Sequence, residues 1–428
     1  MSAPSPPDLP NDCFALPPGT HWTPVDDALA RLRGALHPLT ARVRVPIGAA
    51  AGRFLAADAV ALRANPPCAN AAVDGYGFAA PAGADAVNRL ALMAGRAAAG
   101  APLGAPVPAG MAVRILTGAP LPDGVDTIVL QEIVVRDGDE IAFRGPIRPG
   151  ANTRLAGEDL SPGAHVLAAG RRLRAPDLAL LAAAGIAEIE AFRPLRVGVL
   201  STGDEIRSID APAPPLGPPL GPAEVYDANR PMLLALVAQW GHAPVDLGHV
   251  PDDRAALIAA LDRGAARADV ILTSGGASAG EEDHVSAALA HAGALHTWRI
   301  AIKPGRPLAL GLWGGAPVFG LPGNPVAAFV CALIFAAPAL RALAGGRWSA
   351  PIPVMVPAAF DKRKKAGRRE YLRARLTEGG AAEAFGSEGS GRVSGLSWSD
   401  GLVMLDDPAR HVRPGDPVAW LPYSAFGA

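Results

Sequence analysis

Hydrophobic runs and amphipathic segments alternate along residues 195–343. Runs such as LRVGVL and VILT are continuous and apolar, and a segment with apolar positions at helical spacing follows each of them. This alternation is typical of βαβ units, which place their strands in one parallel sheet. We therefore predict a parallel α/β domain over 193–346. Its expected strands lie at 195–205, 243–250, 268–280 and 316–321, and its expected helices at 228–241, 252–268, 281–293 and from 325 onward.

The flanking segments have a different pattern. Residues 66–154 contain short β-type runs, such as 111–118 and 126–135, which Gly, Pro and Asp turns separate. They predict a small β-rich domain. After about residue 347 the helical periodicity stops, and alternating runs such as 369–376 predict a small C-terminal β domain.

Further elements are expected on both sides of the β-rich domain. Thr23 is the expected cap of a helix over 25–36, and residues 43–61 are typical of a strand, a turn and a second strand. Residues 172–188 have apolar positions typical of a helix. The Pro/Gly stretch 211–223 predicts a surface loop.

Two segments bear on targeting and membranes. The amino terminus lacks the basic and apolar regions of a secretory signal, and its closely spaced prolines predict a disordered lead-in over residues 1–20. The longest apolar stretch, 326–340, is shorter than the ~20 residues of a membrane span and contains Pro338. It therefore predicts a buried core helix.

Composition narrows the class of protein. The chain has 428 residues, more than the ~250–300 at which a single core stops growing, so several domains are expected. Lys and Arg (39) nearly balance Asp and Glu (40). No global field therefore favours nucleic acid or an anionic membrane, and a charged ligand requires a local cluster. Cys13, Cys68 and Cys331 form no C-x-x-C pair, which fits a reducing cytoplasm.

Glycine-rich turns follow three of the expected strands. Ligands of parallel sheets bind beyond the carboxyl ends of the strands, and glycines let backbone N–H groups approach an anion. One such turn is ordinary, but three at one sheet edge predict a site for a phosphate-bearing, anionic small molecule. The candidate residues are Ser201, Thr202 and Gly203 in the first turn, Ser274, Gly275, Gly276, Ser278 and Gly280 in the second, and Gly323, Asn324 and Pro325 in the third.

Acidic residues accompany these turns. Asp204 and Glu205 follow the first turn, and Glu281, Glu282 and Asp283 follow the second. Carboxylates crowded near a phosphate repel it unless a hard cation lies between them, and magnesium is held by one or two carboxylates plus substrate oxygens. Asp204, Glu205 and Asp283 are therefore candidate magnesium ligands or acid–base groups. Glu281 and Glu282 are more typical of helix N-terminal residues.

A basic turn supplies the opposite charge. On one strand, Arg299 and Lys303 point to the same face because side chains alternate with period two, and Lys303 and Arg306 flank a Pro-Gly turn. Three cations around one short turn predict an oxyanion site. A second basic run, 362–373, is more typical of a solvated hairpin or of an anion site than of a nucleic-acid surface, since Tyr371 is its single aromatic residue.

Some enzyme classes lack support in this sequence. The chain has neither the P-loop motif nor the G-x-G-x-x-G fingerprint of dinucleotide-binding domains. Its histidines do not have the spacing of zinc ligands. A P-loop kinase, a Rossmann dehydrogenase and a zinc site are therefore not supported.

Nine short strings occur in one order along the chain. They are Val73-Asp-Gly-Tyr76, Arg114-Ile-Leu-Thr-Gly-Ala-Pro120, Leu130-Gln-Glu132, Gly157-Glu-Asp159, Ser201-Thr-Gly-Asp-Glu205, Tyr226-Asp-Ala-Asn229, Ser274–Asp283, Lys303-Pro-Gly-Arg-Pro307 and Leu321-Pro-Gly-Asn-Pro325. Each string alone is weak, but nine in one order are specific. With them the chain resembles the molybdopterin molybdenumtransferase family, which comprises MoeA and the E-domain of gephyrin-type proteins.

The resemblance implies a multidomain fold of α/β and β-rich parts. Its central domain, 193–346, would be a parallel-sheet molybdopterin-binding domain like those of MoaB and MogA. Residues 66–154 would form the β-rich insert domain, and 347–428 a barrel-like C-terminal β domain. Residues 21–65 and 155–192 would form a discontinuous linking and dimerisation domain of an elongated homodimer.

The resemblance also implies an activity. Molybdenum moves from molybdate into the dithiolene of adenylylated molybdopterin, with magnesium-dependent loss of AMP. The implied partners are a molybdopterin adenylyltransferase and apo-molybdoenzymes or their chaperones, with no nucleic acid and no membrane, and the implied compartment is the cytoplasm.

Residue by residue, the resemblance assigns roles in both parts of the chain. The implied catalytic residues are Asp74, Asp159, Glu205, Asp283 and Lys303, and further substrate-binding positions are Thr117, Arg299, Arg306, Pro307, Arg368 and Ser390. Asp74 and Thr117 lie outside the α/β domain, so they would reach the site from a neighbouring part such as the other subunit. Arg299 and Arg306 stand where the family often has Lys, which makes the anion contact planar and bidentate.

Two alternatives remain open at this point. In the first, the chain is a non-catalytic carrier or scaffold that holds the finished cofactor, although a carrier does not need the set of carboxylates. In the other alternative only the α/β domain is related, as in pyridine-nucleotide deamidases that share this domain type. The Asp-Gly-Tyr and Leu-Thr-Gly-Ala-Pro strings lie outside that domain and argue against the second alternative.

Overall fold

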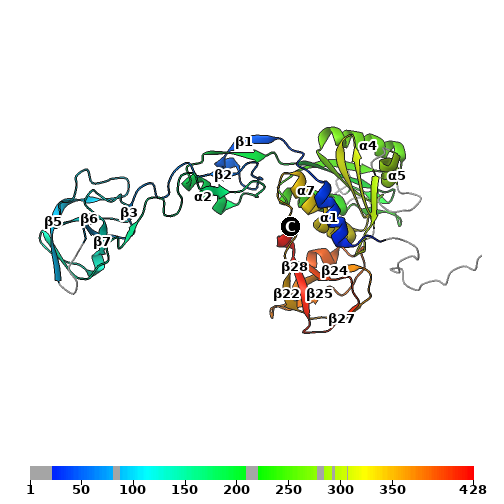
Figure 1. Cartoon of the computed structure of the whole chain (residues 1–428). Coiled ribbons are helices and arrows are strands. Elements are labelled where there is room, and N and C mark those ends of the chain that lie inside the picture. Colours follow the sequence, from blue (N-terminus) through cyan, green and yellow to red (C-terminus); the bar gives the residue numbers. More distant parts are fainter. Residues whose placement is uncertain (1–21, 81–86, 209–219, 277–283, 292–294, 306) are drawn as a thin grey trace, which may run out of the picture. The chain divides into compact units, whose positions relative to one another are not determined.

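The chain forms two compact units in the computed structural model. The smaller unit is 42–191, and the larger unit joins 1–41 to 192–428 (Figure 1). The structure describes residues 22–80, 87–208, 220–276, 284–291, 295–305 and 307–428. The expected lead-in, most of the 211–223 loop and the candidates Ser278, Gly280, Asp283 and Arg306 lie outside the described residues.

A mixed six-stranded sheet forms the α/β part of the larger unit. Its strand order is β16-β13-β17-β21-β20-β18. The first four strands are parallel, as predicted, but β20 is antiparallel to β21 and β18 is antiparallel to β20. The strands are β13 (Arg196–Thr202), β16 (Ala243–Val250), β17 (Val270–Ser274), β18 (Leu295–Arg299), β20 (Pro307–Trp313) and β21 (Ala316–Leu321).

The antiparallel edge corrects the purely parallel prediction, and a short turn explains it. Gly314 and Gly315 join β20 to β21, with φ values of +54° and +83°. A two-residue turn with positive φ at both positions is the connection of a β-hairpin, whereas parallel neighbours need a long crossover. The chain therefore reverses at this edge of the sheet.

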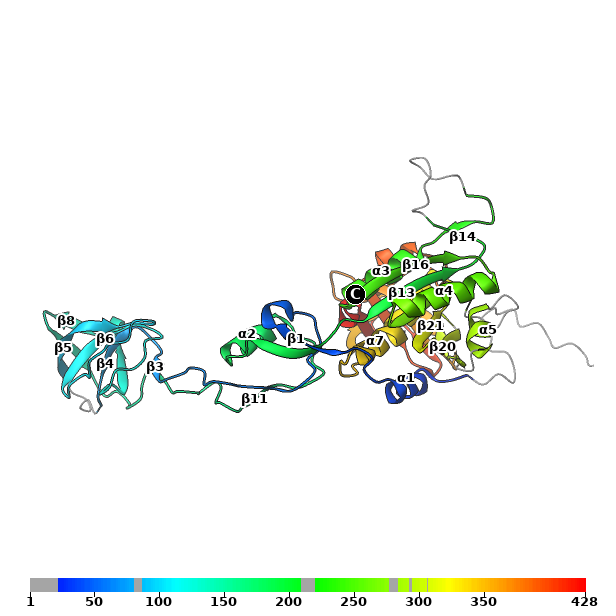
Figure 2. The same ribbon diagram turned by 90° about the horizontal axis from the view of Figure 1, so that it is seen from above.

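Helices pack against this sheet. The predicted helices are present as α3 (Asn229–Gln239), α4 (Arg254–Arg267) and α5 (His284–His291). Asp253 caps α4 by accepting a hydrogen bond from the Ala256 N–H at 2.7 Å, and Gly241 follows α3 with a φ of +85°. Both α3 and α4 lie against β13 and β16 (Figure 2). The core between α4, α5 and the sheet includes Leu200, Leu257, Leu261, Ile271 and Val318.

The long apolar run is a core helix, as predicted. It consists of α6 (Pro325–Cys331), a π-helical turn (Ala332–Ala336) and α7 (Ala337–Leu343). Within the described residues this is the single helical stretch long and apolar enough to cross a membrane, and 83% of its apolar window is buried inside the fold. Burial in protein accounts for its composition.

The C-terminal part is β-rich, as predicted. Its main sheet has the order β19-β24-β26-β28-β22, with β25 beside β24, and a separate pair joins β23 to β27. A short helix, α8 (Ser394–Trp398), precedes β26. The strands are β19 (Ile302–Lys303), β22 (Val354–Pro357), β23 (Lys362–Lys364), β24 (Arg369–Leu376), β25 (Ala382–Ala384), β26 (Gly401–Leu405), β27 (Arg410–Val412) and β28 (Pro417–Pro422).

The basic segment 299–303 is not one strand, and that prediction is wrong. Arg299 ends β18 in the α/β sheet, whereas Lys303 ends β19 in the C-terminal sheet. The chain changes sheets at Ile300 and Ala301, where Thr23 pairs with it: the Thr23 N–H donates to the Arg299 carbonyl and the Ala301 N–H donates to the Thr23 carbonyl, each at 2.8 Å. Thr23 is thus a bridge residue and not the cap of α1 (Val25–Ala35), whose N-cap is Pro24.

The smaller unit contains the expected β-rich sheet. Its strand order is β7-β4-β6-β5-β9-β8, and Phe78 and Phe143 pack in its core with ring centroids 5.4 Å apart. The expected run 126–135 is interrupted by a 3-10 turn, Gln131–Ile133. The strands are β4 (Gly75–Phe78), β5 (Val87–Ala97), β6 (Met111–Ile115), β7 (Thr127–Leu130), β8 (Val135–Asp137) and β9 (Glu140–Arg144).

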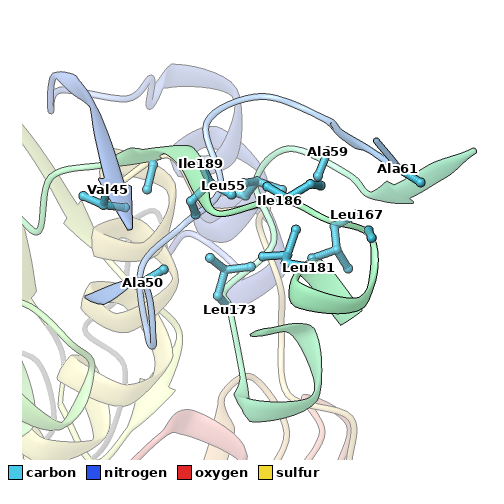
Figure 3. Packing of buried hydrophobic residues seen from close by; sticks show 12 residues of the cluster. Val45, Ala50, Leu55, Ala59, Ala61, Leu167, Leu173, Leu181, Ile186 and Ile189 are labelled. Carbon is cyan, nitrogen blue, oxygen red and sulfur yellow. The ribbon is translucent and has the colours of Figure 1, made fainter. Parts of the chain in front are cut away.

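The smaller unit has a second hydrophobic core, formed by residues from the N-terminal and C-terminal segments of this unit. Side chains such as Leu55, Leu181 and Ile189 lie together there (Figure 3). The expected helix over 172–188 is shorter, because Gly185 with a φ of +79° ends it and a strand begins at Glu188. The elements here are β1 (Arg42–Pro46), β2 (Ala59–Val60), β11 (His165–Leu167), α2 (Ala175–Ala183) and β12 (Glu188–Phe192).

Candidate functional site

The three glycine turns meet at one edge of the α/β sheet. They follow β13, β17 and β21, which are neighbouring parallel strands. The Gly275 N–H donates to the Leu321 carbonyl at 3.2 Å, and a Cβ placed on Gly323 would lie 3.6 Å from the Gly275 Cα. The sheet therefore brings the described candidates of all three turns together.

Glycine is required at the centre of this edge. Gly275 has a φ of +96°, and a Cβ there would lie 2.7 Å from both the carbonyl oxygen and the Oγ1 of Thr202. Neither the backbone conformation nor the space admits a side chain. Within the described residues, the buried hydroxyls of Ser201, Thr202 and Thr273 have no hydrogen-bond partner.

Asn229 connects the second and third glycine turns by hydrogen bonds. Its Nδ2 donates to the Ser274 Oγ at 2.7 Å and to the Gly323 carbonyl at 2.6 Å. The residue is 8% exposed, so the amide is a fixed part of the edge. No role was predicted for Asn229 from the sequence, although it belongs to the Tyr-Asp-Ala-Asn family string, which was the signal for it.

The acidic candidates of the first turn are held in place. The Asp204 N–H donates to Asp252 Oδ2 at 3.3 Å, and the Asp252 N–H donates to Asp204 Oδ1 at 3.0 Å. The Glu205 carboxylate faces Gly203, whose Cβ position would lie 2.5 Å from Glu205 Oε2. Among the described residues, which exclude Asp283, no three His, Cys, Asp or Glu side chains cluster closely enough to hold a metal ion.

Lys303 belongs to a four-membered charge cluster. Its Nζ lies 2.6 Å from Glu388 Oε2 and 3.6 Å from Glu370 Oε1. Lys362 pairs with the same two carboxylates, at 3.0 Å from Glu370 Oε2 and in contact with Glu388 Oε1. Burial alone would raise the pKa of Glu388, but hydrogen bonds from Lys303 and Lys362 outweigh it, so the pKa lies below its ordinary value. Neither glutamate was predicted from the sequence.

The loop that carries Glu388 is pinned to the third glycine turn. The Arg373 guanidinium donates to the carbonyls of Ser387, Gly389 and Arg392. The Val326 N–H donates to the Ser390 carbonyl at 3.0 Å, and Val326 directly follows Pro325. Lys303, Val326 and Glu388 line one small pocket. The candidate Ser390 therefore lies beside the third turn.

The remaining described basic candidates, Arg299 and Arg368, are close in sequence to residues that line this pocket. Arg299 is the cross-strand neighbour of Pro307 at the end of β18, and its side chain is exposed. Arg368 directly precedes β24 and is half-buried.

Three family strings meet in the smaller unit. The Thr117 N–H and Oγ1 each donate to Asp74 Oδ1 at 2.7 Å. Arg114 stacks on Tyr76 at 5.2 Å from the ring centroid, donates to the Gly75 carbonyl at 3.0 Å and also bonds the Gln131 side chain. The hydrogen bonds from Thr117 lower the pKa of Asp74, so this carboxylate is ionised at neutral pH.

Asp159 lies in a separate turn of the smaller unit. Its Oδ2 accepts a hydrogen bond from Asn65 Nδ2 at 2.8 Å, and its N–H donates to the Asn65 carbonyl at 3.1 Å. Gly157, with a φ of +71°, makes this turn possible. The Gly-Glu-Asp string is therefore a fixed chain reversal against Asn65.

Comparison with known proteins covers nearly the whole chain. Residues 23–185 match the MoeA N-terminal region (domain I and II), 198–342 the probable molybdopterin binding domain, and 355–423 the MoeA C-terminal region (domain IV). The molybdopterin molybdenumtransferase of Haemophilus influenzae is 36% identical over 88% of this chain and 92% of its own length. Molybdopterin molybdenumtransferase 2 of Mycobacterium tuberculosis is 33% identical over 90% and 95%.

A solved structure also indicates similarity to MoeA over nearly the whole chain. The molybdopterin biosynthesis MoeA protein of Pyrococcus horikoshii aligns with a TM-score of 0.80 and 28% identity, covering 94% of this chain and 100% of that one. Because the similarity runs through the segments on both sides of the α/β domain, the alternative in which only that domain is related is wrong. The chain belongs to the MoeA family, the molybdopterin molybdenumtransferases of molybdenum cofactor biosynthesis.

Proposed function

We propose that this chain transfers molybdenum from molybdate to the dithiolene of adenylylated molybdopterin in the cytoplasm, with magnesium-dependent release of AMP. One observation carries the proposal. The pocket lined by Lys303 and Glu388 also includes Val326, the residue after the third glycine turn. This neighbourhood supports the proposal of an oxyanion site next to a site for a phosphate-bearing pterin.

Backbone N–H groups at the glycine turns are suited to the phosphates of the pterin substrate. Asn229 holds Ser274 and Gly323 in place, so the turns need little rearrangement when the substrate binds. Lys303 and Lys362 are suited to molybdate, since a tetrahedral dianion pairs well with two ammonium groups. Arg299, Arg306, Pro307, Arg368 and Ser390 are the further positions that we propose for substrate binding.

The residues described near the first turn fit a magnesium site. Asp204 and Glu205 offer hard oxygen donors, and Mg²⁺ commonly takes only one or two carboxylates together with phosphate oxygens and water. We propose Asp204 and Glu205, with Asp283, as its protein ligands. When bound, Mg²⁺ neutralises charge on the phosphates and so favours the departure of AMP.

We further propose that the active form is a homodimer. In that assembly the Asp74–Thr117 pair and Asp159 of one subunit would complete the site on the other. A mixed dimer of Asp74→Asn and Lys303→Ala subunits tests this directly. It retains partial activity if the site is shared between subunits, and it is inactive if each subunit supplies both residues to its own site. We propose a molybdopterin adenylyltransferase and apo-molybdoenzymes or their chaperones as its partners.

The proposed reaction is tested with purified protein, adenylylated molybdopterin, molybdate and Mg²⁺. We expect AMP release that depends on molybdate and Mg²⁺ in the unmodified chain, and strong loss of it in Lys303→Ala. Lys365→Ala, an exposed lysine of the same domain, is the matched control and keeps its activity. If the unmodified protein binds the cofactor but releases no AMP, it is a carrier and the proposal is wrong.

A further inference from the structure

The Glu388 carboxylate bridges two lysines. One of its oxygens contacts Lys303 and the other contacts Lys362. Bridging two ammonium groups with two oxygens is also the arrangement expected for a bound inorganic oxyanion. Glu388 lines the same pocket as Lys303, so an external anion that enters the pocket to reach Lys303 meets the Glu388 carboxylate there.

The second carboxylate of the cluster is fixed. Glu370 is 6% exposed, lies on β24 and stands in register with Lys303 across the β19–β24 pair. Its position is therefore set by the sheet. The Glu388 side chain, by contrast, is 45% exposed and comes from a loop. Of the two carboxylates, Glu388 is the one that can turn away into water without breaking a sheet.

The backbone on both sides of Glu388 is held. Arg373 donates to the carbonyls of Ser387 and Gly389, and a third bond to Arg392 ties down the end of the loop. Turning Glu388 out therefore requires a change of side-chain rotamer and no movement of the loop. Such rotations are fast for exposed side chains.

The net charge of the cluster depends on whether Glu388 faces the two lysines. With Glu388 in place, two lysines face two glutamates, and the cluster is neutral. With Glu388 turned out, Glu370 is the carboxylate that stays in this four-membered cluster, and the four side chains then contribute one net positive charge. A dianion gains more from this vacated pair than a monoanion does, because Coulomb energy scales with the charge of the ligand.

We propose that Glu388 is a built-in competitor of the substrate oxyanion: a dianion binds Lys303 and Lys362 by displacing the Glu388 carboxylate, which lowers its affinity and excludes monoanions. This inference rests on the proposed function in that it takes molybdate as the oxyanion. Glu388 is thus a specificity-determining residue.

The test is molybdate binding by titration calorimetry, without pterin, for the full-length protein and for Glu388→Gln. We expect Glu388→Gln to bind molybdate at least about tenfold more tightly, since one competing charge is gone. It should also bind a monoanion such as perchlorate, which the unmodified protein excludes. Glu383→Gln is the matched control: Glu383 pairs with Arg375 at 2.9 Å in the same domain, does not line the pocket, and makes the same change of charge.

Unchanged or weaker molybdate binding by Glu388→Gln would overturn the proposal, because Glu388 would then merely hold the lysines. An equal gain in Glu383→Gln would overturn it as well, since the effect would come from net charge. If Glu388→Gln does not fold, Glu388→Asp is used instead. Its side chain is one methylene shorter, and we expect a smaller increase in molybdate affinity. In turnover, we expect KM for molybdate to fall while kcat changes little. Absence of AMP release from the unmodified protein would refute the proposed reaction, whereas the binding data judge the competition by themselves.

Discussion

Asp74 accepts two hydrogen bonds at one oxygen from Thr117, whose backbone N–H and hydroxyl both lie 2.7 Å from Asp74 Oδ1. The residues are 43 positions apart and belong to two different family strings. Their contact fixes the orientation of the carboxylate and leaves Oδ2 outside these two bonds. An oriented, ionised carboxylate at this point fits the role that the family resemblance implies for Asp74.

Replacing Thr117 tests what the hydroxyl does. The Thr117 hydrogen bonds lower the pKa of Asp74, so Thr117→Val, which keeps the N–H but loses the hydroxyl, raises that pKa toward its ordinary value. Thr117→Ser leaves it unchanged. The measurement is an NMR titration of the Asp74 carboxyl carbon. Because Asp74 stays ionised at neutral pH in all three proteins, any loss of activity in Thr117→Val at pH 7 reflects orientation and not charge. An identical titration curve in Thr117→Val would contradict this account.

Gly275→Ala tests the close approach of the second turn to the first. The substitution places a Cβ 2.7 Å from Thr202 atoms at a φ of +96°. We expect destabilisation by more than the ~1–2 kcal/mol of a left-handed residue alone, together with loss of pterin binding. Gly248→Ala is the control, since its φ is +80° with no atom within 4 Å of the Cβ position. Denaturant unfolding compares the two variants, and equal losses would show that the contact with Thr202 has no role.

Asn229→Ala tests the bridge between the second and third turns. It leaves the Ser274 hydroxyl and the Gly323 carbonyl without their donor, which costs roughly 1–3 kcal/mol for buried groups. We also expect faster hydrogen exchange at Gly275 and weaker binding of the pterin. Asn229→Asp keeps the shape but removes the donor, so it should behave like the alanine variant. A stable Asn229→Asp with unchanged pterin affinity would show that the bridge is dispensable.

Asp269 is expected to make the stability of the fold depend on pH. Burial alone would raise its pKa, but hydrogen bonds from Arg193 and Arg196 outweigh it and lower the pKa to about 2. A carboxyl with a lowered pKa in the fold stabilises it above its unfolded pKa, and this stability is lost as pH falls toward the folded pKa. We expect Asp269→Asn to cost roughly 2 kcal/mol at pH 7, from about 1.4 kcal/mol per pKa unit. The difference should shrink between pH 5 and pH 2 in unfolding experiments, and a difference that does not change with pH would contradict the assignment.

The sequence was most informative where structure depends on local periodicity. The strands and helices of the α/β core have their own patterns, so the parallel arrangement of β13, β17 and β21 and the meeting of their turns were predictable. The antiparallel edge was not predicted, although Gly314-Gly315 is a hairpin signal. The expected helix over 172–188 was too long, because Gly185 ends it and a strand begins at Glu188.

Contacts between distant segments were not predictable from patterns. Lys303 meets Glu388 across 85 positions, and neither residue has a local signature of the contact. The switch of sheets at Ile300 depends on pairing with Thr23, which lies in another part of the sequence. The pairing of Asp74 with Thr117 was likewise anticipated only in that the family resemblance named both residues.

Diffraction from crystals soaked with molybdate and AMP tests the central claim most directly, because the anomalous signal of molybdenum locates the oxyanion. The account predicts molybdate within hydrogen-bond distance of the Lys303 and Lys362 ammonium groups, with Glu388 turned away and the nucleotide phosphate at the Ser274–Gly276 turn. Molybdate bound away from both lysines, or with Glu388 still bridging them, would contradict it.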